Sequence, residues 1–290
     1  LRIENLYGSA FNDKLTGDTT PNVIEGGAGA DTIDGGAGAD TMSGGGASDI
    51  YYVDNVGDIV TETSADLATG GIDSVYSTLL AYTLPSHVEK LRILTGGVAN
   101  GTGNNLDNFL YAGAGDNVLD GGGGTDTLSY FYATGAVSVS LNVLGPQVTG
   151  ASGSDTLINI ENLYGGAFDD TLSGDANPNR LDGGAGADTL IGGSGADTLV
   201  GGSGRDHFAL NLDSGSDRIT DFTPGEDLIQ LSIALGFTEF AELDTNADGT
   251  FDNGDAAVQM VGADMMIDFG AAQLRIVAQS HFHSSDFLFV

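Results

Sequence analysis

The stretch Gly26-Gly27-Ala28-Gly29-Ala30-Asp31-Thr32-Ile33-Asp34 decides the fold of this chain. Residues 35–43 repeat it as GGAGADTMS, which gives the pattern G-G-x-G-x-D-x-U-x, where U is a large apolar residue. Strict copies begin at Gly26, Gly35, Gly121, Gly183, Gly192 and Gly201. A period of nine residues indicates a solenoid, because one such unit cannot bury its apolar residue alone and must stack on its neighbours.

Weaker copies keep the same frame and extend the repeats into three blocks. They begin at Gly8, Gly17, Gly44, Gly103, Ala112, Gly165 and Gly174. Residues 3–8 (IENLYG) return as residues 160–165, so a larger unit is also duplicated. Between the blocks, alternating β-branched residues over 51–95 and 130–160 predict short strands. Beyond residue 210 we expect a short helix near 232–243 and strands at 257–261, 264–269, 273–278 and 286–290.

The composition excludes several classes of protein. Eight Lys and Arg face 41 Asp and Glu, so the formal charge is −33, and no basic face for nucleic acid can form. No apolar run is long enough for a transmembrane helix, and without Cys there is no disulfide or zinc-thiolate site. Disorder is disfavoured because 40% of the residues are hydrophobic and periodically placed. The chain starts at Leu1 within a repeat, so we expect it to be the C-terminal part of a longer protein.

Each part of the nonapeptide has a physical role. Glycine permits the backbone angles of a tight turn, and the Asp at position 6 adds a short carboxylate at the end of that turn. The apolar residue points inward from a three-residue strand. Stacked coils would form ladders of these apolar residues: Ile33, Met42 and Tyr51 in the first block, and Leu172, Leu190, Leu199 and Phe208 in the third.

Stacking also creates an electrostatic problem. Equivalent carboxylates would lie about 4.8 Å apart, and at an effective dielectric of about 20 each adjacent pair repels by roughly 3 kcal/mol. The few Lys and Arg do not occupy these positions. Carboxylates and turn carbonyls are hard oxygen ligands that suit Ca²⁺ better than the strictly octahedral Mg²⁺. Folding should therefore be coupled to metal binding.

These repeats resemble those of the RTX (repeats-in-toxin) proteins, which Gram-negative bacteria secrete through type I systems. The resemblance covers nearly the whole chain. It implies right-handed parallel β-rolls in which two nonapeptides make one coil. It also implies that a Ca²⁺ lies between the turns of repeats n and n+2, held by their position-6 acids and by glycine-turn carbonyls.

Carried onto this sequence, the resemblance implies about seven calcium sites. The position-6 pairs are Asp13 with Asp31, Asp31 with Asp49, Asn22 with Asp40, Asn108 with Asp126, Asp170 with Asp188, Asp188 with Asp206, and Asn179 with Asp197; Asn117 occupies the same position without a pair. The turn glycines are Gly26, Gly27, Gly35, Gly36, Gly183, Gly184, Gly192, Gly193, Gly201 and Gly202. Sites where Asn replaces Asp, or where Ala47 replaces the third glycine, should be weaker or empty.

A second calcium signal lies outside the repeats. Residues 244–255 (DTNADGTFDNGD) match an EF-hand loop, except that Asp replaces the final bidentate Glu, so weaker binding is expected. Its ligands would be Asp244, Asn246, Asp248, Asp252 and Asp255. The alternative is a turn rich in Asn and Asp.

Two further segments resemble parts of secreted RTX enzymes. Asp217 and Asp221 resemble the segment that closes a roll and would complete a last site; the alternative is a solvated strand and turn. Residues 285–290 (SDFLFV) resemble a type I secretion signal, and they also read as a terminal edge strand. Both interpretations of this end can hold together.

Other patterns carry weaker hypotheses. Neither a G-x-S-x-G elbow nor an H-E-x-x-H motif occurs, so we expect no catalytic residues in this region. His281 and His283 could hold a transition metal but read better as surface residues. The recurrent Thr at position 7 favours an exposed strand over an ice- or sugar-binding face. Several tyrosines (Tyr51, Tyr52, Tyr76, Tyr82, Tyr130 and Tyr132) could stack on sugars or cap the core.

The sequence thus predicts an all-β protein, a right-handed parallel β-roll or β-helix with a C-terminal β-rich cap. We expect roll blocks at 1–56, 103–129 and 165–222, intervening segments at 57–102 and 130–164, and the cap at 223–290. The expected function is Ca²⁺-driven folding outside the cell in support of type I secretion of a larger protein, with calcium ions and the secretion machinery as partners. The alternatives are part of a surface adhesin or surface layer, or a polysaccharide-binding module.

Overall fold

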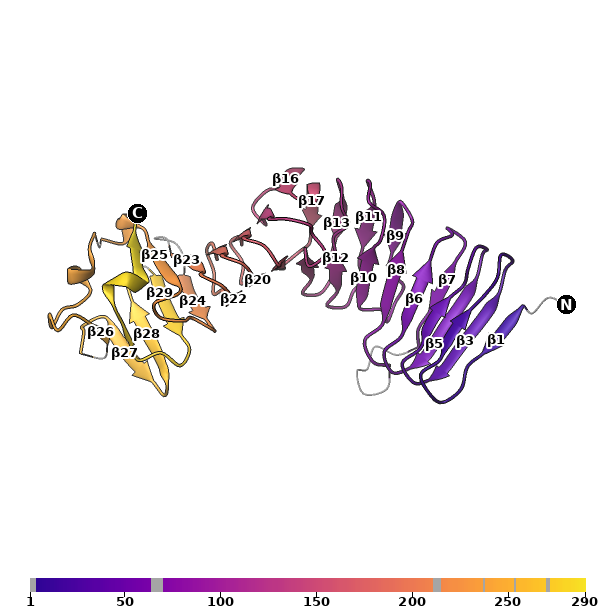
Figure 1. Cartoon of the computed structure of the whole chain (residues 1–290), viewed down its shortest axis with the longest axis horizontal. Coiled ribbons are helices and arrows are strands. Elements are labelled where there is room, and N and C mark those ends of the chain that lie inside the picture. Colours follow the sequence, from indigo (N-terminus) through magenta and orange to yellow (C-terminus); the bar gives the residue numbers. More distant parts are fainter. Residues whose placement is uncertain (1–3, 64–69, 211–214, 237, 253, 270–271) are drawn as a thin grey trace. The chain divides into compact units, whose positions relative to one another are not determined.

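The computed structural model describes residues 4–63, 70–210, 215–236, 238–252, 254–269 and 272–290. The chain divides into two compact units. Unit 1 comprises Leu1–Tyr132 with Ser152–Ile160, and unit 2 comprises Ala133–Ala151 with Glu161–Val290. Within each unit, short strands are stacked coil upon coil (Figure 1). This architecture confirms the predicted all-β parallel solenoid.

Unit 1 places its strands in three parallel sheets. The first contains β1 (Asn5–Tyr7), β3 (Val23–Ala28), β5 (Thr41–Gly46) and β7 (Ile59–Thr61). The second contains β2 (Lys14–Thr16), β4 (Thr32–Asp34), β6 (Ile50–Val53), β8 (Ser74–Ser77), β10 (Lys90–Ile93), β12 (Phe109–Tyr111) and β14 (Thr127–Ser129). The third contains β9 (Ala81–Thr83), β11 (Asn100–Thr102), β13 (Val118–Asp120) and β17 (Gly153–Ile158).

Unit 2 combines parallel coils with an antiparallel C-terminal part. One sheet contains β15 (Ser138–Ser140), β19 (Thr171–Ser173), β21 (Thr189–Ile191), β23 (His207–Leu210), β25 (Leu228–Leu231) and β31 (Phe287–Phe289). The other contains β18 (Asn162–Gly166), β20 (Arg180–Ala185), β22 (Thr198–Ser203), β24 (Gly215–Ile219), β29 (Ala272–Ile276), β28 (Asp264–Asp268) and β27 (Val258–Val261). Unit 2 also contains β16 (Gln147–Gly150), and a separate two-stranded antiparallel sheet is formed by β26 (Phe251–Asp252) and β30 (His281–Phe282).

The repeats pair in register at a spacing of 18 residues, which is two nonapeptides. Ile33 lies opposite Tyr51, and Leu172 lies opposite Leu190. Alternate nonapeptides therefore contribute strands to opposite sheets of the solenoid. This spacing agrees with the expectation that two nonapeptides make one coil.

The apolar residue of each nonapeptide forms the core. Ile33, Tyr51 and Val75 form one continuous column, and all three are fully buried. The prediction that Met42 belongs to this column is wrong. Met42 stacks between Ile24 and Val60 in the facing sheet, because successive nonapeptides alternate between sheets. In unit 2, Leu199 is likewise separated from Leu172, Leu190 and Phe208. Full burial of each such side chain contributes about 1.5–3 kcal/mol.

The C-terminal part of unit 2 extends the solenoid. Strand β29 pairs parallel with β24 and antiparallel with β28, and β31 pairs parallel with β25 at the edge of its sheet. The expected helix near 232–243 consists of two 3₁₀ turns, η1 (Ile233–Leu235) and η2 (Phe240–Glu242), and a third, η3 (Ser284–Asp286), precedes β31. No helix in the described part of the chain has the length and apolarity needed to span a membrane.

Candidate metal centre

Each position-6 acid stands at the end of a glycine turn, immediately before a strand. Asp31 precedes β4, Asp49 precedes β6 and Asp188 precedes β21. The turn places the side chain beside the same position of the next coil. Asp31, Asp49 and Asp188 are no more than 1% exposed, which is unusual for carboxylates that have no cationic partner.

The position-6 residues of successive coils are joined by hydrogen bonds into columns that we call the carboxylate ladder. The backbone N–H of Asp31 donates to Oδ1 of Asp49 at 2.7 Å, and the N–H of Asp170 donates to Oδ1 of Asp188 at 2.7 Å. The other predicted pairs with this contact, at 2.7–2.9 Å, are Asp13 with Asp31, Asn22 with Asp40, Asn108 with Asp126, Asp188 with Asp206, and Asn179 with Asp197. The structure therefore brings together all seven pairs that the resemblance implied.

The second oxygen of these carboxylates is buried without a hydrogen-bond partner. This holds, within the part of the chain that the structure describes, for Oδ2 of Asp31, Asp40, Asp49, Asp73, Asp170, Asp188, Asp197 and Asp217. A buried polar atom is costly unless it is paired or coordinates a metal. One oxygen of each carboxylate is thus fixed by the backbone, while the other remains available to a ligand.

The first glycine of each repeat keeps open the space beside this oxygen. A Cβ on Gly26 would lie 2.2 Å from Oδ2 of Asp31 and 2.7 Å from the carbonyl oxygen of Gly44. A Cβ on Gly165 would lie 2.5 Å from Oδ2 of Asp170 and 2.5 Å from the carbonyl oxygen of Gly183. A carboxylate oxygen and a carbonyl oxygen of the next coil therefore converge beside a glycine, and these are the donors that Ca²⁺ prefers.

The remaining predicted glycines have equivalent roles. A Cβ added to any of the other first glycines would lie 2.3–2.5 Å from Oδ2 of the acid in the same repeat; these glycines are Gly35, Gly183, Gly192 and Gly201. The second glycines Gly27, Gly36, Gly184, Gly193 and Gly202 have positive φ. Ala47 also has a positive φ, 72°, at a position where other repeats have glycine. An alanine in this region costs about 1 kcal/mol, so this turn is strained.

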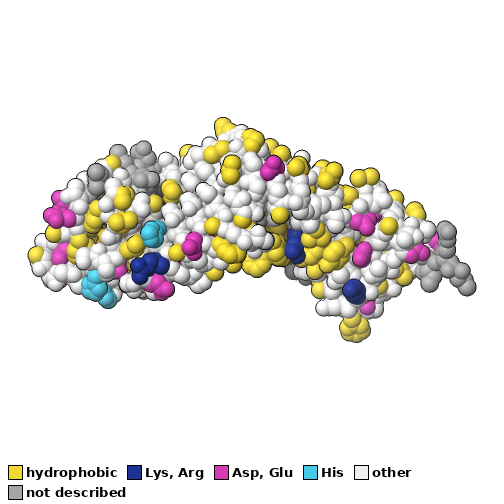
Figure 2. Space-filling model, turned by 45° about the horizontal axis from the view of Figure 1, so that its top comes forward, with side chains coloured by type: hydrophobic (Ala, Val, Ile, Leu, Met, Phe, Trp, Pro, Cys, Tyr) yellow, Lys and Arg dark blue, Asp and Glu magenta, His cyan; other side chains and the backbone are white. Residues whose placement is uncertain are grey.

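Burial raises the pKa of the ladder carboxylates. It raises the pKa of Asp49 and Asp188 to about 7 and that of Asp217 to about 8, with smaller contributions from neighbouring acids. The ion pairs of the described residues, Arg180–Asp182 and Arg275–Asp264, use acids outside the ladder. Acidic side chains are few on the face that Figure 2 shows, since many lie inside the coils. The ladder thus concentrates negative charge that only protons or a cation can neutralise.

The asparagines at position 6 behave differently from the acids. The side-chain amides of Asn108 and Asn179 donate to the carbonyl oxygens of Val88 and Glu161 in the preceding coil, at 3.2 and 2.8 Å. The amide of Asn117 donates to the carbonyl of Ala99 at 2.6 Å. An N–H donor in this position uses a backbone carbonyl as its acceptor, and weaker calcium binding at these positions stays a prediction.

The second block has one predicted pair, Asn108 with Asp126, and the repeats end after it. Asp126 precedes β14, is 1% exposed and accepts the N–H of Asn108 at 2.7 Å, as the pairing predicts. Its Oδ2 lies 2.4 Å from the Cβ point of Gly121, but the carbonyl that converges there belongs to Asn159 and not to a repeat glycine. The backbone oxygen of the pair itself is the carbonyl of Gly121, which converges with Oδ1 of Asn108 beside Gly103, as in the other blocks. The carbonyl of Asn159 takes this role only beyond Asp126, because no fourth repeat follows in this block.

The ladder extends beyond the nonapeptides through residues that the repeat spacing did not identify. The N–H of Asp49 donates to Asp73 and the N–H of Asp73 donates to Glu89, at 2.7 and 2.8 Å. Further additions are Asp58, which follows Asp40, Asp155, which follows Asn117, and Asp227, which follows Asp206. The intervening segment of unit 1 therefore continues the coils and their acidic columns.

The two acids predicted to close the third block have different positions. Asp217 is 2% exposed and accepts the N–H of Asp197 at 3.1 Å, so it is a member of the ladder. Asp221 accepts the N–H groups of Gly201 and Gly202 at 3.0 and 2.8 Å. It caps a glycine turn and does not extend the column of position-6 acids.

The loop at 244–255 closes on its own carboxylates. Oδ1 of Asp255 accepts the N–H groups of Thr245 and Asn246, and Asp244 accepts those of Asp248 and Gly249. Gly249 has a φ of 87°, as the sharp turn at the sixth position of an EF-hand loop requires. Hydrogen bonds from the Thr250 hydroxyl and N–H lower the pKa of Asp248, and Asp252 accepts the N–H of Gly254. The predicted ligands are gathered in one loop, and calcium binding there stays a prediction.

Asp286 near the C-terminus caps a 3₁₀ turn, and the tyrosines lie partly in the core and partly at the surface. Asp286 is fully buried and caps η3 while accepting the N–H of Gly225 at 2.8 Å. Strand β31 follows it, which confirms the terminal edge strand. Tyr51 and Tyr130 are core residues, whereas Tyr132 is 42% exposed and stacks under the guanidinium of Arg92.

Asp188 is the ladder member most suited to substitution, because it belongs to two predicted pairs. Asp188→Asn keeps the oxygen that accepts the Asp170 N–H but removes the charge. We expect the Ca²⁺ midpoint of folding to rise about tenfold or more, measured by circular dichroism. Asp107→Asn is the control, since exposed Asp107 also accepts a backbone N–H, from Thr125 at 2.8 Å. Equal shifts in both variants would contradict a special role for the ladder.

The comparison with protein-family models agrees with the repeat pattern. A family model described as the RTX calcium-binding nonapeptide repeat matches residues 16–51, 102–130, 159–177 and 175–208. No curated protein matches the chain in sequence. Among solved structures, it is similar to the extracellular lipase LipA from Serratia marcescens, with 17% identity and a TM-score of 0.27. The match covers 79% of this chain and 46% of the lipase chain.

Proposed function

Because this chain carries RTX calcium-binding nonapeptide repeats, we propose that it is a module that folds when extracellular Ca²⁺ neutralises its carboxylate ladder. The observation that carries the proposal is the set of buried carboxylate oxygens without a hydrogen-bond partner, as at Asp31, Asp40 and Asp188. RTX repeats bind Ca²⁺, and the ladder supplies the oxygen donors that such an ion needs.

The residues proposed to hold the ions are the position-6 acids and the carbonyls of the glycine turns. About seven ions would lie along the predicted pairs, and one more in the loop at 244–255. When bound, Ca²⁺ supplies the positive charge that offsets the buried carboxylates. The chain's own part is to fix one oxygen of each carboxylate with a backbone N–H and to keep the adjacent space open with glycine.

The ladder also supports a role in secretion. At cytosolic Ca²⁺ concentrations the closely spaced carboxylates repel one another and oppose folding, so the chain can pass through a type I channel unfolded. Outside the cell, Ca²⁺ near millimolar matches the affinity of about 10⁻⁴–10⁻³ M that extracellular modules have. The module would then serve a larger secreted protein whose catalytic part lies elsewhere.

A calcium titration tests this function. Far-UV circular dichroism should show a cooperative coil-to-β transition between about 0.1 and 1 mM Ca²⁺. Mg²⁺ at equal concentration should not produce it, since Mg²⁺ demands octahedral geometry and retains its water. A chain that is already folded in chelator at neutral pH would show that the ladder does not control folding.

A further inference from the structure

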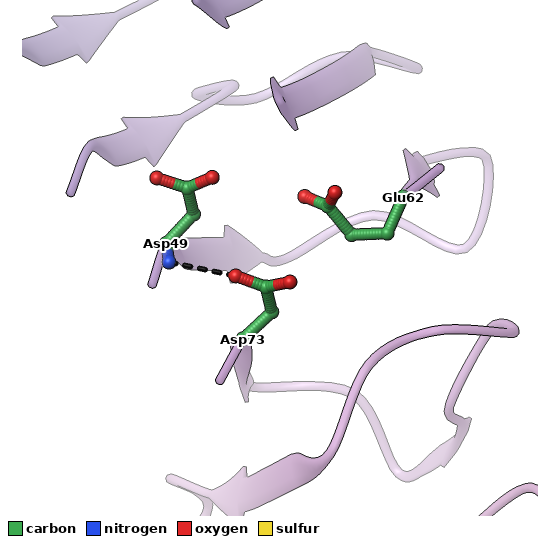
Figure 3. Close-up of side chains that lie close together, drawn as sticks. All are labelled: Asp49, Glu62 and Asp73. Carbon is green, nitrogen blue, oxygen red and sulfur yellow. Dashed lines mark hydrogen bonds between the residues drawn. The ribbon is translucent and has the colours of Figure 1, made fainter. Parts of the chain in front are cut away.

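Three acidic side chains meet where one sheet of unit 1 ends. Asp49 precedes β6, Asp73 precedes β8, and Glu62 follows β7. One carboxylate oxygen from each residue lies within 4.8 Å of the other two, and the carboxylates of Glu62 and Asp73 face the same space in Figure 3. The side chains are 1%, 0% and 6% exposed for Asp49, Asp73 and Glu62. We call them the terminal cluster.

Glu62 enters this cluster because of its place in the coil. The first glycines of three coils, Gly8, Gly26 and Gly44, are spaced by 18 residues, and the next position in this series is Glu62. The pairing of β5 with β7 keeps this register, since Ser43 lies opposite Thr61. Strand β7 is the last of its sheet. Where earlier coils of this sheet have a glycine, the coil that contains β7 therefore has a carboxylate.

The glycine turn that ends this series has different oxygens from the turns before it. Beside Gly26, the carbonyl of Gly44 in the next coil converges with Oδ2 of Asp31. Beside Gly44, Oδ2 of Asp49 is again present, and the second oxygen is the Tyr51 hydroxyl, which donates to Glu62 of the next coil. Glu62 is thus joined to the Asp49 turn through Tyr51, although it lies outside the nonapeptide motif.

Each carboxylate of the terminal cluster has one oxygen fixed and one without a partner. Asp49 accepts the Asp31 N–H, Asp73 accepts the Asp49 N–H, and Glu62 accepts the Tyr51 hydroxyl. The second oxygens, Oδ2 of Asp49 and Asp73 and Oε2 of Glu62, have no hydrogen-bond partner. His87 donates from Nδ1 to the backbone carbonyl of Glu62 at 3.1 Å and not to its carboxylate. Burial raises the pKa of Glu62, although hydrogen bonds from Tyr51 and from nearby backbone N–H groups oppose this.

We infer that Asp49, Glu62 and Asp73 bind a Ca²⁺ ion at a site that the nonapeptide motif does not define. Three converging carboxylates supply hard oxygen donors and more negative charge than any predicted ladder pair. The inference rests on the proposed function only in the choice of ion, because two of the three ligands lie outside the repeats. The site would fasten the last coil of this sheet to the strands that follow.

Calcium stoichiometry, measured by equilibrium dialysis at saturating Ca²⁺, tests the site. Glu62→Gln and Asp73→Asn should each bind one Ca²⁺ fewer than the unaltered chain, or bind it at least tenfold more weakly. Glu25→Gln is the matched control, since Glu25 is an exposed glutamate on β3 of the same sheet, and it should retain every ion. Circular dichroism at saturating Ca²⁺ checks that the variants fold.

Tb³⁺ luminescence excited through tyrosine gives a second readout that locates the ion. The Tyr51 hydroxyl contacts Glu62, so Tyr51 is placed to sensitise Tb³⁺ in the terminal cluster. Sensitised emission should fall in Glu62→Gln and in Tyr51→Phe and persist in Glu25→Gln. If Glu62→Gln does not fold, Tyr51→Phe and Asp73→Asn decide the question.

The outcomes separate this site from the proposed function. If Glu62→Gln and Asp73→Asn bind as many ions as the unaltered chain with unchanged affinity, the site is refuted while Ca²⁺-driven folding stands. A variant that is more stable in chelator but retains every ion would mean that protons neutralise the cluster, which also refutes the site. A chain that does not fold on Ca²⁺ but loses one bound ion in Glu62→Gln would support the site and refute the proposed function.

Discussion

Gly183→Ala is expected to abolish the Ca²⁺-dependent folding of unit 2 or to raise its Ca²⁺ midpoint by more than tenfold. A Cβ at residue 183 would lie 2.3 Å from Oδ2 of Asp188 and 2.7 Å from its Cβ, far inside van der Waals contact. The carboxylate must move, yet its other oxygen is held by the N–H of Asp170. The substitution therefore removes a proposed calcium ligand without changing any charge.

Gly145→Ala is the matched control in the same unit. A Cβ at residue 145 would meet nothing within 4 Å, and Gly145 is not among the residues with positive φ. Its free energy of unfolding should stay within about 0.5 kcal/mol of the unaltered chain. Calcium titrations followed by circular dichroism, with urea unfolding at saturating Ca²⁺, would compare the two. Similar behaviour of the variants would mean that the space beside Gly183 has no role in metal binding.

Acidification should fold the metal-free chain. Burial raises the pKa of Asp188 to about 7, of Asp206 to about 6 and of Asp217 to about 8, whereas unfolded aspartate titrates near 3.9. Between these values the folded state binds more protons than the unfolded state, so the free energy of unfolding falls as pH rises. Stability from these groups is present below pH about 4 and is lost as pH rises through about 6–8.

The measurement is circular dichroism in metal-free buffer from pH 8 to pH 5. The β signal should grow as the pH falls. The affinity of the folded chain for Ca²⁺ should fall over the same range, because protons compete with the metal for the carboxylates. Monovalent salt at pH 8 should not reproduce the effect, since salt screens exposed charges much more than buried ones. A β signal that declines on acidification would show that the buried acids are not what opposes folding.

The repeat spacing was sufficient to predict a solenoid, and the resemblance to RTX repeats supplied the pairing of the position-6 residues. Because two nonapeptides make one coil in that family, residues 18 positions apart, such as Asp31 and Asp49, were expected on successive coils. The stacking of the core was predicted less well. Met42 and Tyr51 are neighbouring repeats in the sequence, but alternate nonapeptides face each other across the coil instead of stacking.

The ladder members outside the blocks could not be found from the period. Asp73 follows Asp49 by 24 residues, Glu89 follows Asp73 by 16, and Asp155 follows Asn117 by 38. Coils of unequal length keep the strands in register while the loops between them vary, so a fixed-period search fails. Glu62 keeps the 18-residue period of the first glycines, but the nonapeptide motif requires glycine at that position, so the motif does not include it. A signal for the terminal cluster was therefore present in the sequence.

The hydrogen bonds of the ladder all have the same direction along the chain. A backbone N–H of one coil is satisfied by a carboxylate of the coil that follows it, as Asp188 does for Asp170 and Asp206 does for Asp188. No coil is complete until its successor is in place. The last nonapeptide match ends at residue 208, but Asp206 and Asp197 receive their carboxylates from Asp227 and Asp217. The smallest fragment with a finished third block therefore extends past residue 227, and a boundary drawn at the last repeat would divide a coil.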